Sequence, residues 1–329
     1  MHLPSIRTEI TEIVTGLGML GYDSLERALV RRPREMSDVP LTTWNRVVMA
    51  VDEPRHRVDA AGAWRNGQVF LGSDEGLRRR PPISIEWKGG HKAPGSEPVP
   101  VDLRVDHVYL VSCKYASKIL LNAAPSQLFE SRSPSGDWFD EVAPAQHQNL
   151  YEKAREHVVG NDLPAFVTDL AKHHRARLRS ALDDWSDDCV AAYREMSLEV
   201  GRSSAAKWRA SLSSKRKREA MLWRLLRIGS APYFILGSAG DQSLRVRVTT
   251  PWDWRRRFEF RDFECWGEDA GQPRVGWRAG VRDHELGDDL GVEGHVQIRW
   301  SHGRFGQSPE AKVYLDTPHD RVPGYLSLK

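Results

Sequence analysis

The stretch VDLRVDHVYLVSCKY, residues 101–115, decides how the N-terminal part of this 329-residue chain folds. Two runs of the β-branched and apolar residues typical of strands, 102–105 and 108–114, are separated by almost nothing. This spacing predicts two antiparallel strands joined by a tight hairpin. The second run is continuous and apolar, which indicates a buried central strand.

Polar side chains lie at the open end of this predicted hairpin. Side chains alternate between the two faces of a strand, so Ser112 and Lys114 share one face while Cys113 takes the other. With a loop of residues 106–108, Asp102 lies opposite Ser112 and the three polar groups converge. A two-residue turn would instead put Asp102 on the other face. The three-residue loop therefore predicts a cluster of an acid, a hydroxyl and an amine.

This arrangement resembles the PD-(D/E)xK nuclease superfamily, in which an acid at the start of one strand is followed by Glu-x-Lys at the end of the next. Here the pattern reads Asp102, nine intervening residues, and Ser112-Cys113-Lys114, a degenerate SxK variant. The resemblance covers about residues 1–130 and implies an α+β fold with a restriction-endonuclease-like mixed sheet flanked by helices.

A second carboxylate must come from elsewhere, because the hydroxyl of Ser112 is a weak ligand for Mg²⁺, which prefers carboxylate oxygens. The candidates, in order, are Glu86 in the strand-like run ISIEWKGG, Glu12 on the first predicted helix, and Asp106. A rival motif, Asp74 followed by Glu86-Trp87-Lys88, keeps the acid of the family pattern intact. Its spacer contains Arg78-Arg79-Arg80-Pro81-Pro82, so the later motif is preferred.

The resemblance also implies a mechanism for phosphodiester hydrolysis. Carboxylates hold one or two Mg²⁺ or Mn²⁺ ions, the metal activates a bound water, and the lysine orients or activates that nucleophile. The two motifs share Glu86, so Glu86 and Asp102 are the expected metal ligands. The expected catalytic set is Asp102, Ser112, Lys114 and Glu86.

The patterns on either side of this hairpin predict further elements. Apolar residues recur at helical spacing over residues 6–17, behind Ser5 as a typical N-cap. Residues 44–115 predict short strands and hairpins, with the turn cluster GGHKAPGSEPVP, residues 89–100, as a surface loop. SKILLNA, residues 117–123, returns to a helical pattern.

A helical region and a β-rich region follow. Residues 145–227 predict amphipathic helices with breaks at 160–164 and 201–204, the last helix being strongly basic. From residue 232 onward, alternating polar and apolar residues predict an antiparallel sheet. The expected domains are therefore a nuclease-like core at 1–143, a helical region at 144–228 and a β-rich domain at 229–329.

The β-rich region is dense in arginine and tryptophan, a combination that suits DNA recognition, because guanidinium groups bind phosphate and aromatic rings stack on bases. In the run HVQIRW, His295, Gln297 and Arg299 share a polar face. The following loop SHGRFG contains two glycines that let polar side chains approach a phosphate closely. The candidate nucleic-acid-binding residues are Arg299, His302, Arg304, Lys215 and Arg216.

Composition and missing motifs exclude several other classes of protein. The 48 Lys+Arg against 45 Asp+Glu give a net charge of only +3, which excludes a polycation. Three separated cysteines without a CxxC pair fit neither a disulfide framework nor a thiolate zinc site, and no signal peptide or membrane span is present, so a cytoplasmic protein is expected. GxSxG, HExxH, GxGxxG and Walker motifs are absent from the sequence.

The sequence thus favours a Mg²⁺-dependent DNA endonuclease of restriction or phage-defence type. A homodimer or partner defence proteins stay open as further partners. Two alternatives come from other classes: a non-catalytic nucleic-acid-binding or scaffold protein with a decayed nuclease fold, motivated by Ser112 in the acid position, and an interaction module unrelated to nucleic acid.

Overall fold

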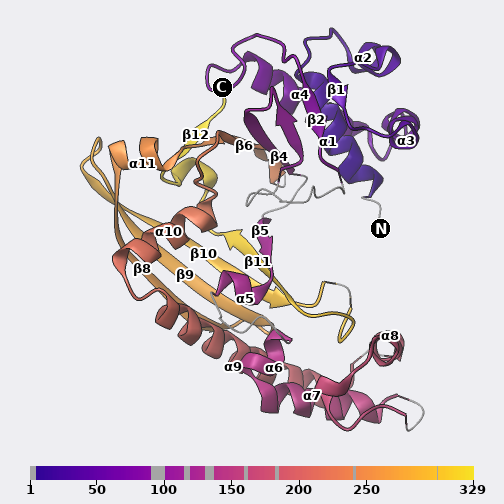
Figure 1. Ribbon diagram of the computed structural model, residues 1–329, viewed down its shortest axis with the longest axis vertical. Coiled ribbons are helices and arrows are strands. Elements are labelled where there is room, and N and C mark those ends of the chain that lie inside the picture. Colours follow the sequence, from indigo (N-terminus) through magenta and orange to yellow (C-terminus); the bar gives the residue numbers. More distant parts are fainter. Residues whose placement is uncertain are drawn as a thin grey trace. The chain divides into compact units, whose positions relative to one another are not determined.

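Two units, each built from segments that are distant in the sequence, make up the computed structural model of this chain (Figure 1). Unit 1 comprises Met1–Lys118, Leu226–Phe258 and Pro318–Lys329, and unit 2 comprises Ile119–Leu225 and Glu259–Thr317. The structure describes residues 5–89, 101–114, 119–129, 137–158, 162–181, 185–239, 242–301 and 303–329.

A mixed seven-stranded sheet forms the centre of unit 1, in the order β1-β2-β3-β4-β6-β7-β12. The pairs β1/β2 and β4/β6 are parallel and the other pairs are antiparallel. The strands are β1 (Met36–Ser37), β2 (Ile85–Trp87), β3 (Leu103–Val105), β4 (Tyr109–Lys114), β6 (Tyr233–Ala239), β7 (Gln242–Val248) and β12 (Tyr325–Ser327). The expected mixed sheet is therefore present, and β4 is an inner strand of it, as its apolar run indicates.

Helices α1 and α4 pack against one another and against this sheet (Figure 1). Ser5 caps α1 as predicted, with the Thr8 amide donating to the Ser5 hydroxyl at 3.3 Å. Apolar residues of α1 and α4 share one buried core with the sheet residues Val111 and Phe234. The helices of unit 1 are α1 (Ile6–Gly18), α2 (Leu25–Arg31), α3 (Leu41–Val51), α4 (Arg57–Gly72), α11 (Pro251–Arg257) and the short 3₁₀ helix η2 (His319–Arg321).

The strands expected between residues 44 and 72 are instead the helices α3 and α4. In α3, Trp44, Val47 and Val51 are buried whereas Met49 is exposed, which is a helical spacing that the β-branched content of RVVMAV obscures. The predicted loop at 89–100 lies outside the described residues, apart from Gly89. No described helix is both long and apolar enough to span a membrane.

Unit 2 contains an antiparallel five-stranded sheet in the order β5-β11-β10-β9-β8. Its strands are β5 (Ile119–Ala123), β8 (Phe258–Asp269), β9 (Pro273–Asp283), β10 (Asp288–Arg299) and β11 (Glu310–Leu315). The helical prediction for SKILLNA is wrong for residues 119–123, because β5 pairs with β11. In β10 the predicted alternation is confirmed, since Val296 and Ile298 are fully buried.

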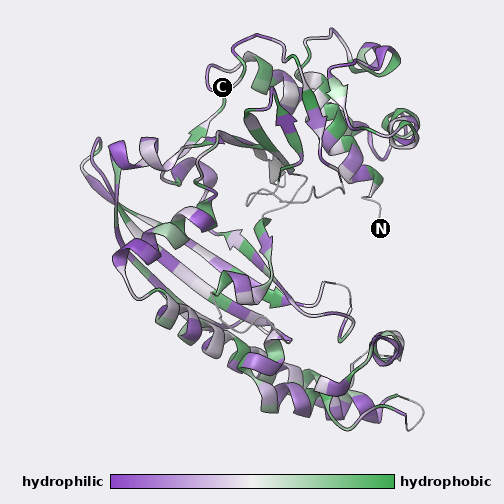
Figure 2. Ribbon diagram, viewed as in Figure 1, coloured by the Kyte–Doolittle hydropathy of each residue, from purple (hydrophilic) through white to green (hydrophobic). Residues whose placement is uncertain are grey.

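The helices of unit 2 include one long helix that crosses a predicted break. They are α5 (Pro125–Leu128), α6 (Trp138–Val142), α7 (Pro144–Glu156), the 3₁₀ helix η1 (Val167–Asp169), α8 (Lys172–Ala181), α9 (Asp187–Ser211) and α10 (Lys215–Leu226). Helix α9 continues through Gly201, where a Cβ atom would lie 2.8 Å from the carbonyl oxygen of Arg274. Gly201 therefore allows close packing on β9 rather than ending the helix. Green and purple bands alternate along α9 in Figure 2, as expected for a helix with one buried face.

The domain boundaries also differ from the predicted 1–143, 144–228 and 229–329. Strand β6 pairs with β4 in parallel, with Ser112 opposite Ile235, so part of the predicted β-rich domain completes the sheet of unit 1. Strand β5, from the predicted nuclease core, belongs to the sheet of unit 2. A parallel neighbour needs a long crossover connection, and the segment between β4 and β6 contains β5 and the helices of unit 2.

Candidate active site

The β3–β4 hairpin has the three-residue loop that the sequence predicts. Leu103 lies opposite Val111 and Val105 opposite Tyr109, which leaves residues 106–108 as the loop. Asp106 and His107 have φ values of 50° and 58°, the left-handed backbone that a tight turn requires. This register puts Asp102 opposite Ser112, as expected.

Asp102 is held in place by the end of β4. The Ser112 hydroxyl donates to Asp102 Oδ2 at 3.2 Å, and the backbone N–H of Cys113 donates to the same oxygen at 2.6 Å. Ser112 is only 1% exposed. The Ser112 hydroxyl therefore orients the Asp102 carboxylate and is not itself open to a ligand in the structure.

A cavity of about 390 Å³ in unit 1 joins this hairpin to helix α1. It is lined by Ser5, Arg7, Thr8, Thr11, Glu12, Asp102, Cys113 and Lys114. The cavity brings together two carboxylates and one amine, which come from α1, the segment before β3 and the end of β4. It is the place where the predicted acid and lysine meet.

Glu12, and not Glu86, is the second carboxylate of this cavity. The Trp87 indole Nε1 donates to Glu12 Oε2 at 2.6 Å and fixes the side chain, which is 7% exposed. Glu12 lies one turn after Thr8 on α1, so both side chains lie on the same face of the helix.

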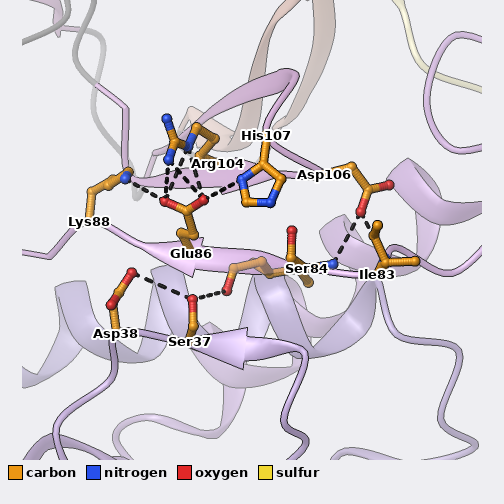
Figure 3. A network of polar contacts seen from close by, with 10 residues as sticks. Ser37, Asp38, Ile83, Ser84, Glu86, Lys88, Arg104, Asp106 and His107 are labelled. Atoms are coloured by element: carbon orange, nitrogen blue, oxygen red, sulfur yellow. Dashed lines mark hydrogen bonds and ion pairs between the residues drawn. The ribbon is translucent and has the colours of Figure 1, made fainter.

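Glu86 is bound by three basic side chains instead (Figure 3). Lys88 Nζ, Arg104 Nη2 and His107 Nδ1 each lie 2.7 Å from a carboxylate oxygen of Glu86. Burial opposes ionisation of Glu86, but the hydrogen bonds from Arg104 and Lys88 outweigh it and lower the pKa of Glu86 to about 2. Glu86 does not line the cavity, so the structure does not bring it together with Asp102 there, and Glu12 takes the place expected for Glu86.

The other two candidate acids have structural surroundings. Asp106 Oδ1 accepts hydrogen bonds from the backbone N–H groups of Ile83 and Ser84, at 2.7 and 3.1 Å, and so ties the hairpin loop to the segment before β2 (Figure 3). Asp74 is exposed in the turn after α4, and in the described part of the chain it makes no contact with Glu86. The rival Asp74, Glu86 and Lys88 motif is therefore not assembled.

The three ionisable groups of the cavity have shifted pKa values. Burial, and then the neighbouring Asp102 charge, raises the pKa of Glu12 to about 8. Burial also raises the pKa of Asp102, although Lys114 and the hydrogen bonds from Cys113 and Ser112 oppose this shift. Burial lowers the pKa of the Lys114 ammonium against the opposing effect of Asp102. The cavity therefore disfavours two free carboxylates until a cation joins them.

The donor set of the cavity fits a divalent metal ion. Two carboxylates that share one site repel each other, and a bound cation reverses this cost. Their oxygen atoms suit Mg²⁺ or Mn²⁺, and water completes the coordination of such ions. Among the described residues, none forms an ion pair with the Lys114 ammonium, which leaves this group available to a bound water or phosphate.

Sequence reasoning ranked Glu12 below Glu86, although one signal favoured Glu12. Glu9 and Glu12 are acidic residues within the helical apolar pattern of residues 6–17, and both are buried close to Ile13 in the sequence. A buried carboxylate is unusual unless it is paired or binds a metal. Glu9 is paired with Arg46, whose Nη2 atom lies 2.7 Å from Glu9 Oε2. Glu12 instead lines the cavity.

The predicted nucleic-acid-binding residues all belong to unit 2, and the structure describes four of the five. Lys215 Nζ lies 3.6 Å from Glu259 Oε1, and Arg216 is exposed on α10. Arg299 of β10 lies opposite Glu310 of β11 in the strand register, and the Arg304 guanidinium lies 4.2 Å from the centre of the Trp185 ring. His302 lies outside the described residues. These positions leave the DNA-binding role a prediction.

In comparisons with protein-family models, curated proteins and solved structures, no match to this chain was found.

Proposed function

We propose that this chain is a metal-dependent DNA endonuclease with a restriction-endonuclease-like core in unit 1, of restriction or phage-defence type. The observation that carries the proposal is the cavity in which Glu12, Asp102 and Lys114 meet. Two carboxylates and a lysine around one small cavity are the groups that metal-assisted phosphodiester hydrolysis requires.

Each residue of the cavity has a chemical role in this proposal. Glu12 and Asp102 would hold Mg²⁺ or Mn²⁺, and such an ion supplies an activated water and stabilises the negative charge of the transition state. Ser112 and the Cys113 amide orient Asp102 through the hydrogen bonds already described. Lys114 has a lowered pKa, so it can orient the attacking water or take up a proton from it.

The N-terminal end of α1 suits the phosphate group of the substrate. Ser5 and Thr8 line the same cavity as Glu12, and the first turn of a helix presents backbone N–H groups and a positive dipole end. Arg7 also lines the cavity, while its Nε atom donates to Asp59 at 2.7 Å. In this proposal, Glu12 and Asp102 hold the metal ion, and the hydrogen-bond donors of the first turn of α1 face the phosphate group that the ion binds.

The setting of the proposed enzyme rests on further observations. The three cysteines, Cys113, Cys189 and Cys265, are free, which supports a reducing compartment such as the cytoplasm. DNA is the proposed partner, because unit 2 exposes basic side chains such as Arg216.

Plasmid nicking with Mg²⁺ or Mn²⁺ tests this function. We expect Glu12→Gln, Asp102→Asn and Lys114→Met each to lower the cleavage rate by about 10²–10⁴-fold, the range for loss of a positioned catalytic group. The matched control is Asp74→Asn, which removes an exposed carboxylate of unit 1 and is expected to cleave like the wild type. Single-stranded DNA, duplex DNA and RNA are compared as substrates.

A further variant, Glu86→Gln, tests which of Glu12 and Glu86 is the second carboxylate of the site. We expect it to retain cleavage, because Glu86 is bound by Lys88, Arg104 and His107 outside the cavity. Equal cleavage by the wild type and all three cavity variants would contradict the nuclease assignment. Salt-sensitive DNA retention without any cleavage would favour the second candidate, a binding protein with a decayed nuclease fold, to which Ser112 in the acid position points.

A further inference from the structure

A group of side chains of the types that ligate metals lies in unit 2, at the junction of α6 and α7. Asp137, Asp140 and His147 each offer one ligand atom, and these atoms lie within 4.8 Å of one another. Asp137 is the N-cap of α6, Asp140 follows one turn later, and His147 lies in the first turns of α7. The short connection between the two helices brings the three side chains together.

Two buried polar atoms of this group have no hydrogen-bond partner among the described residues. Asp137 Oδ1 accepts from the Phe139 amide at 3.1 Å, but Asp137 Oδ2 is unpartnered, and the residue is 6% exposed. His147 is 1% exposed, and its Nε2 atom is also unpartnered, while its Nδ1 atom lies 2.6 Å from Asp140 Oδ1. Leaving such atoms buried and unpaired is costly, so the site is incomplete without a ligand.

Aromatic side chains around His147 shield its imidazole ring from water. Its ring stacks on Phe305 at 5.8 Å and makes an edge contact with Phe139 at 5.5 Å. The Asp140 side chain is 21% exposed, so the group is open to solvent at Asp140. Arg175 is the basic side chain near Asp137, and it donates to the backbone carbonyl oxygens of Leu170 and Phe305 rather than to the two carboxylates.

We propose that Asp137, Asp140 and His147 bind one Zn²⁺ ion that joins α6 to α7. One imidazole nitrogen and two carboxylates form a mixed N/O ligand set that suits Zn²⁺ better than Mg²⁺, which prefers oxygen ligands alone. Ligands of one tetrahedral ion at 2.0–2.1 Å lie about 3.4 Å apart, which the 4.8 Å spread can reach by small side-chain rotations. Water entering beside Asp140 supplies the fourth ligand. Binding releases any proton held between His147 and Asp140, and nothing is oxidised or reduced.

Zinc titration of the metal-stripped full chain tests this site independently of the nuclease. The background variant carries Glu12→Gln and Asp102→Asn, so the cavity of unit 1 no longer contributes a carboxylate pair. By calorimetry and metal analysis we expect this background to bind one Zn²⁺ per chain, and Zn²⁺ to raise its Tm. Adding Asp140→Ala is expected to weaken Zn²⁺ binding by at least about tenfold. Replacing a residue that only supports a metal ligand already lowers metal affinity by about 10–100-fold, so loss of a ligand should cost no less.

The controls separate a lost ligand from a damaged fold. Asp137→Asn keeps an oxygen for the N-cap of α6 but removes the negative charge, and it should also weaken Zn²⁺ binding. The matched control, Asp162→Asn, removes an exposed carboxylate of unit 2 that is paired with Arg177, and it should bind Zn²⁺ like the background. Circular dichroism checks that each variant is folded, and Mg²⁺ is the control metal. No Zn²⁺ bound by the background, or equal binding by folded Asp140→Ala and Asp137→Asn, would overturn the proposal.

Discussion

Glu12 links the chemistry of the cavity to the stability of the fold. Its pKa is about 8 in the folded chain against an ordinary value of 4.5, because of burial and then the Asp102 charge. Between these two values the folded chain keeps a proton that the unfolded chain releases. The free energy of unfolding therefore falls as pH rises from about 4.5 to 8, and the loss is complete above this window.

Glu12→Gln is therefore expected to stabilise the metal-free chain at high pH. Glutamine carries no charge at any pH and still offers an oxygen to the Trp87 indole. We expect its Tm to exceed that of the wild type by several degrees at pH 8, and the difference to shrink towards zero near pH 5. Thermal unfolding followed by circular dichroism across this pH range measures the effect.

Saturating Mg²⁺ provides the control for this prediction. In the proposed function the ion takes the place of the proton that Glu12 carries, so Mg²⁺ should raise the Tm of the wild type at pH 8 more than that of Glu12→Gln. A Tm difference between the two proteins that stays constant from pH 5 to pH 8 would show that the titration of Glu12 is not its cause.

The sequence predicted the local part of this site and missed the part that depends on packing. Asp102, Ser112 and Lys114 follow from the period of two along a hairpin whose loop length sets the register. Glu12 reaches the cavity only because α1 packs on the sheet, and sequence spacing does not report that contact. Glu86 looked equivalent because neighbouring cations such as Arg104 are not visible from strand patterns.

At the scale of elements, the position of α1 depends on its crossing with α4. A Cβ atom added at Gly67 would lie 2.1 Å from the carbonyl oxygen of Thr15, and one added at Gly18 would lie 2.3 Å from that of Trp64. The two backbones therefore touch at a pair of glycines. Because α1 carries Glu12, this crossing also fixes where Glu12 lies in the cavity.

Gly67→Ala is expected to destabilise the chain by about 1–3 kcal/mol, the usual cost of overpacking a rigid contact. It should also reduce cleavage, since α1 must shift away from α4 and carries Glu12 with it. Urea unfolding and plasmid nicking measure the two effects.

Gly62→Ala on the same helix is the matched control. A Cβ atom added at Gly62 has no neighbour within 4 Å, and alanine restricts the unfolded chain more than glycine does. We expect this variant to be unchanged or more stable by about 0.4–1 kcal/mol. Equal destabilisation by Gly62→Ala and Gly67→Ala would contradict the close crossing.

The sequence predicted helix or strand correctly where the apolar periodicity was clear, and wrongly where β-branched residues lie on helices. The apolar spacing of residues 6–17 predicted α1 and its Ser5 cap correctly. RVVMAV contains three valines, yet it forms part of α3, because burial at helical spacing outweighs the weak strand preference of valine. Residues 119–123 form β5 because β11 offers a partner from the far end of the chain.

At the scale of the whole molecule, the chain passes between the two units four times, after residues 118, 225, 258 and 317. Sequence patterns report the type of each segment but not its partner, so consecutive domains were expected. Strand β6 shows the difficulty, because its apolar run YFILG fits a central strand of either sheet. Its pairing with β4 and its packing against α4 assign it to unit 1.

Each unit has its own buried core, and this predicts that core mutations loosen the units separately. Phe234 on β6 is fully buried in the core of unit 1, and Phe260 on β8 is 2% exposed in unit 2. Replacing either phenylalanine with alanine should cost about 3–5 kcal/mol, which is large against the stability of a typical domain.

Hydrogen exchange read by mass spectrometry distinguishes the two units under mild conditions. Phe234→Ala should speed exchange in β4 and β6 and leave β9 and β10 protected, and Phe260→Ala should do the reverse. The same pair tests the site, because only Phe234→Ala weakens the sheet that holds Asp102 and Lys114 and should reduce metal-dependent cleavage. If both variants accelerate exchange equally in all four strands, the chain opens as one cooperative unit, and the cavity depends on the core of unit 2 as much as on its own.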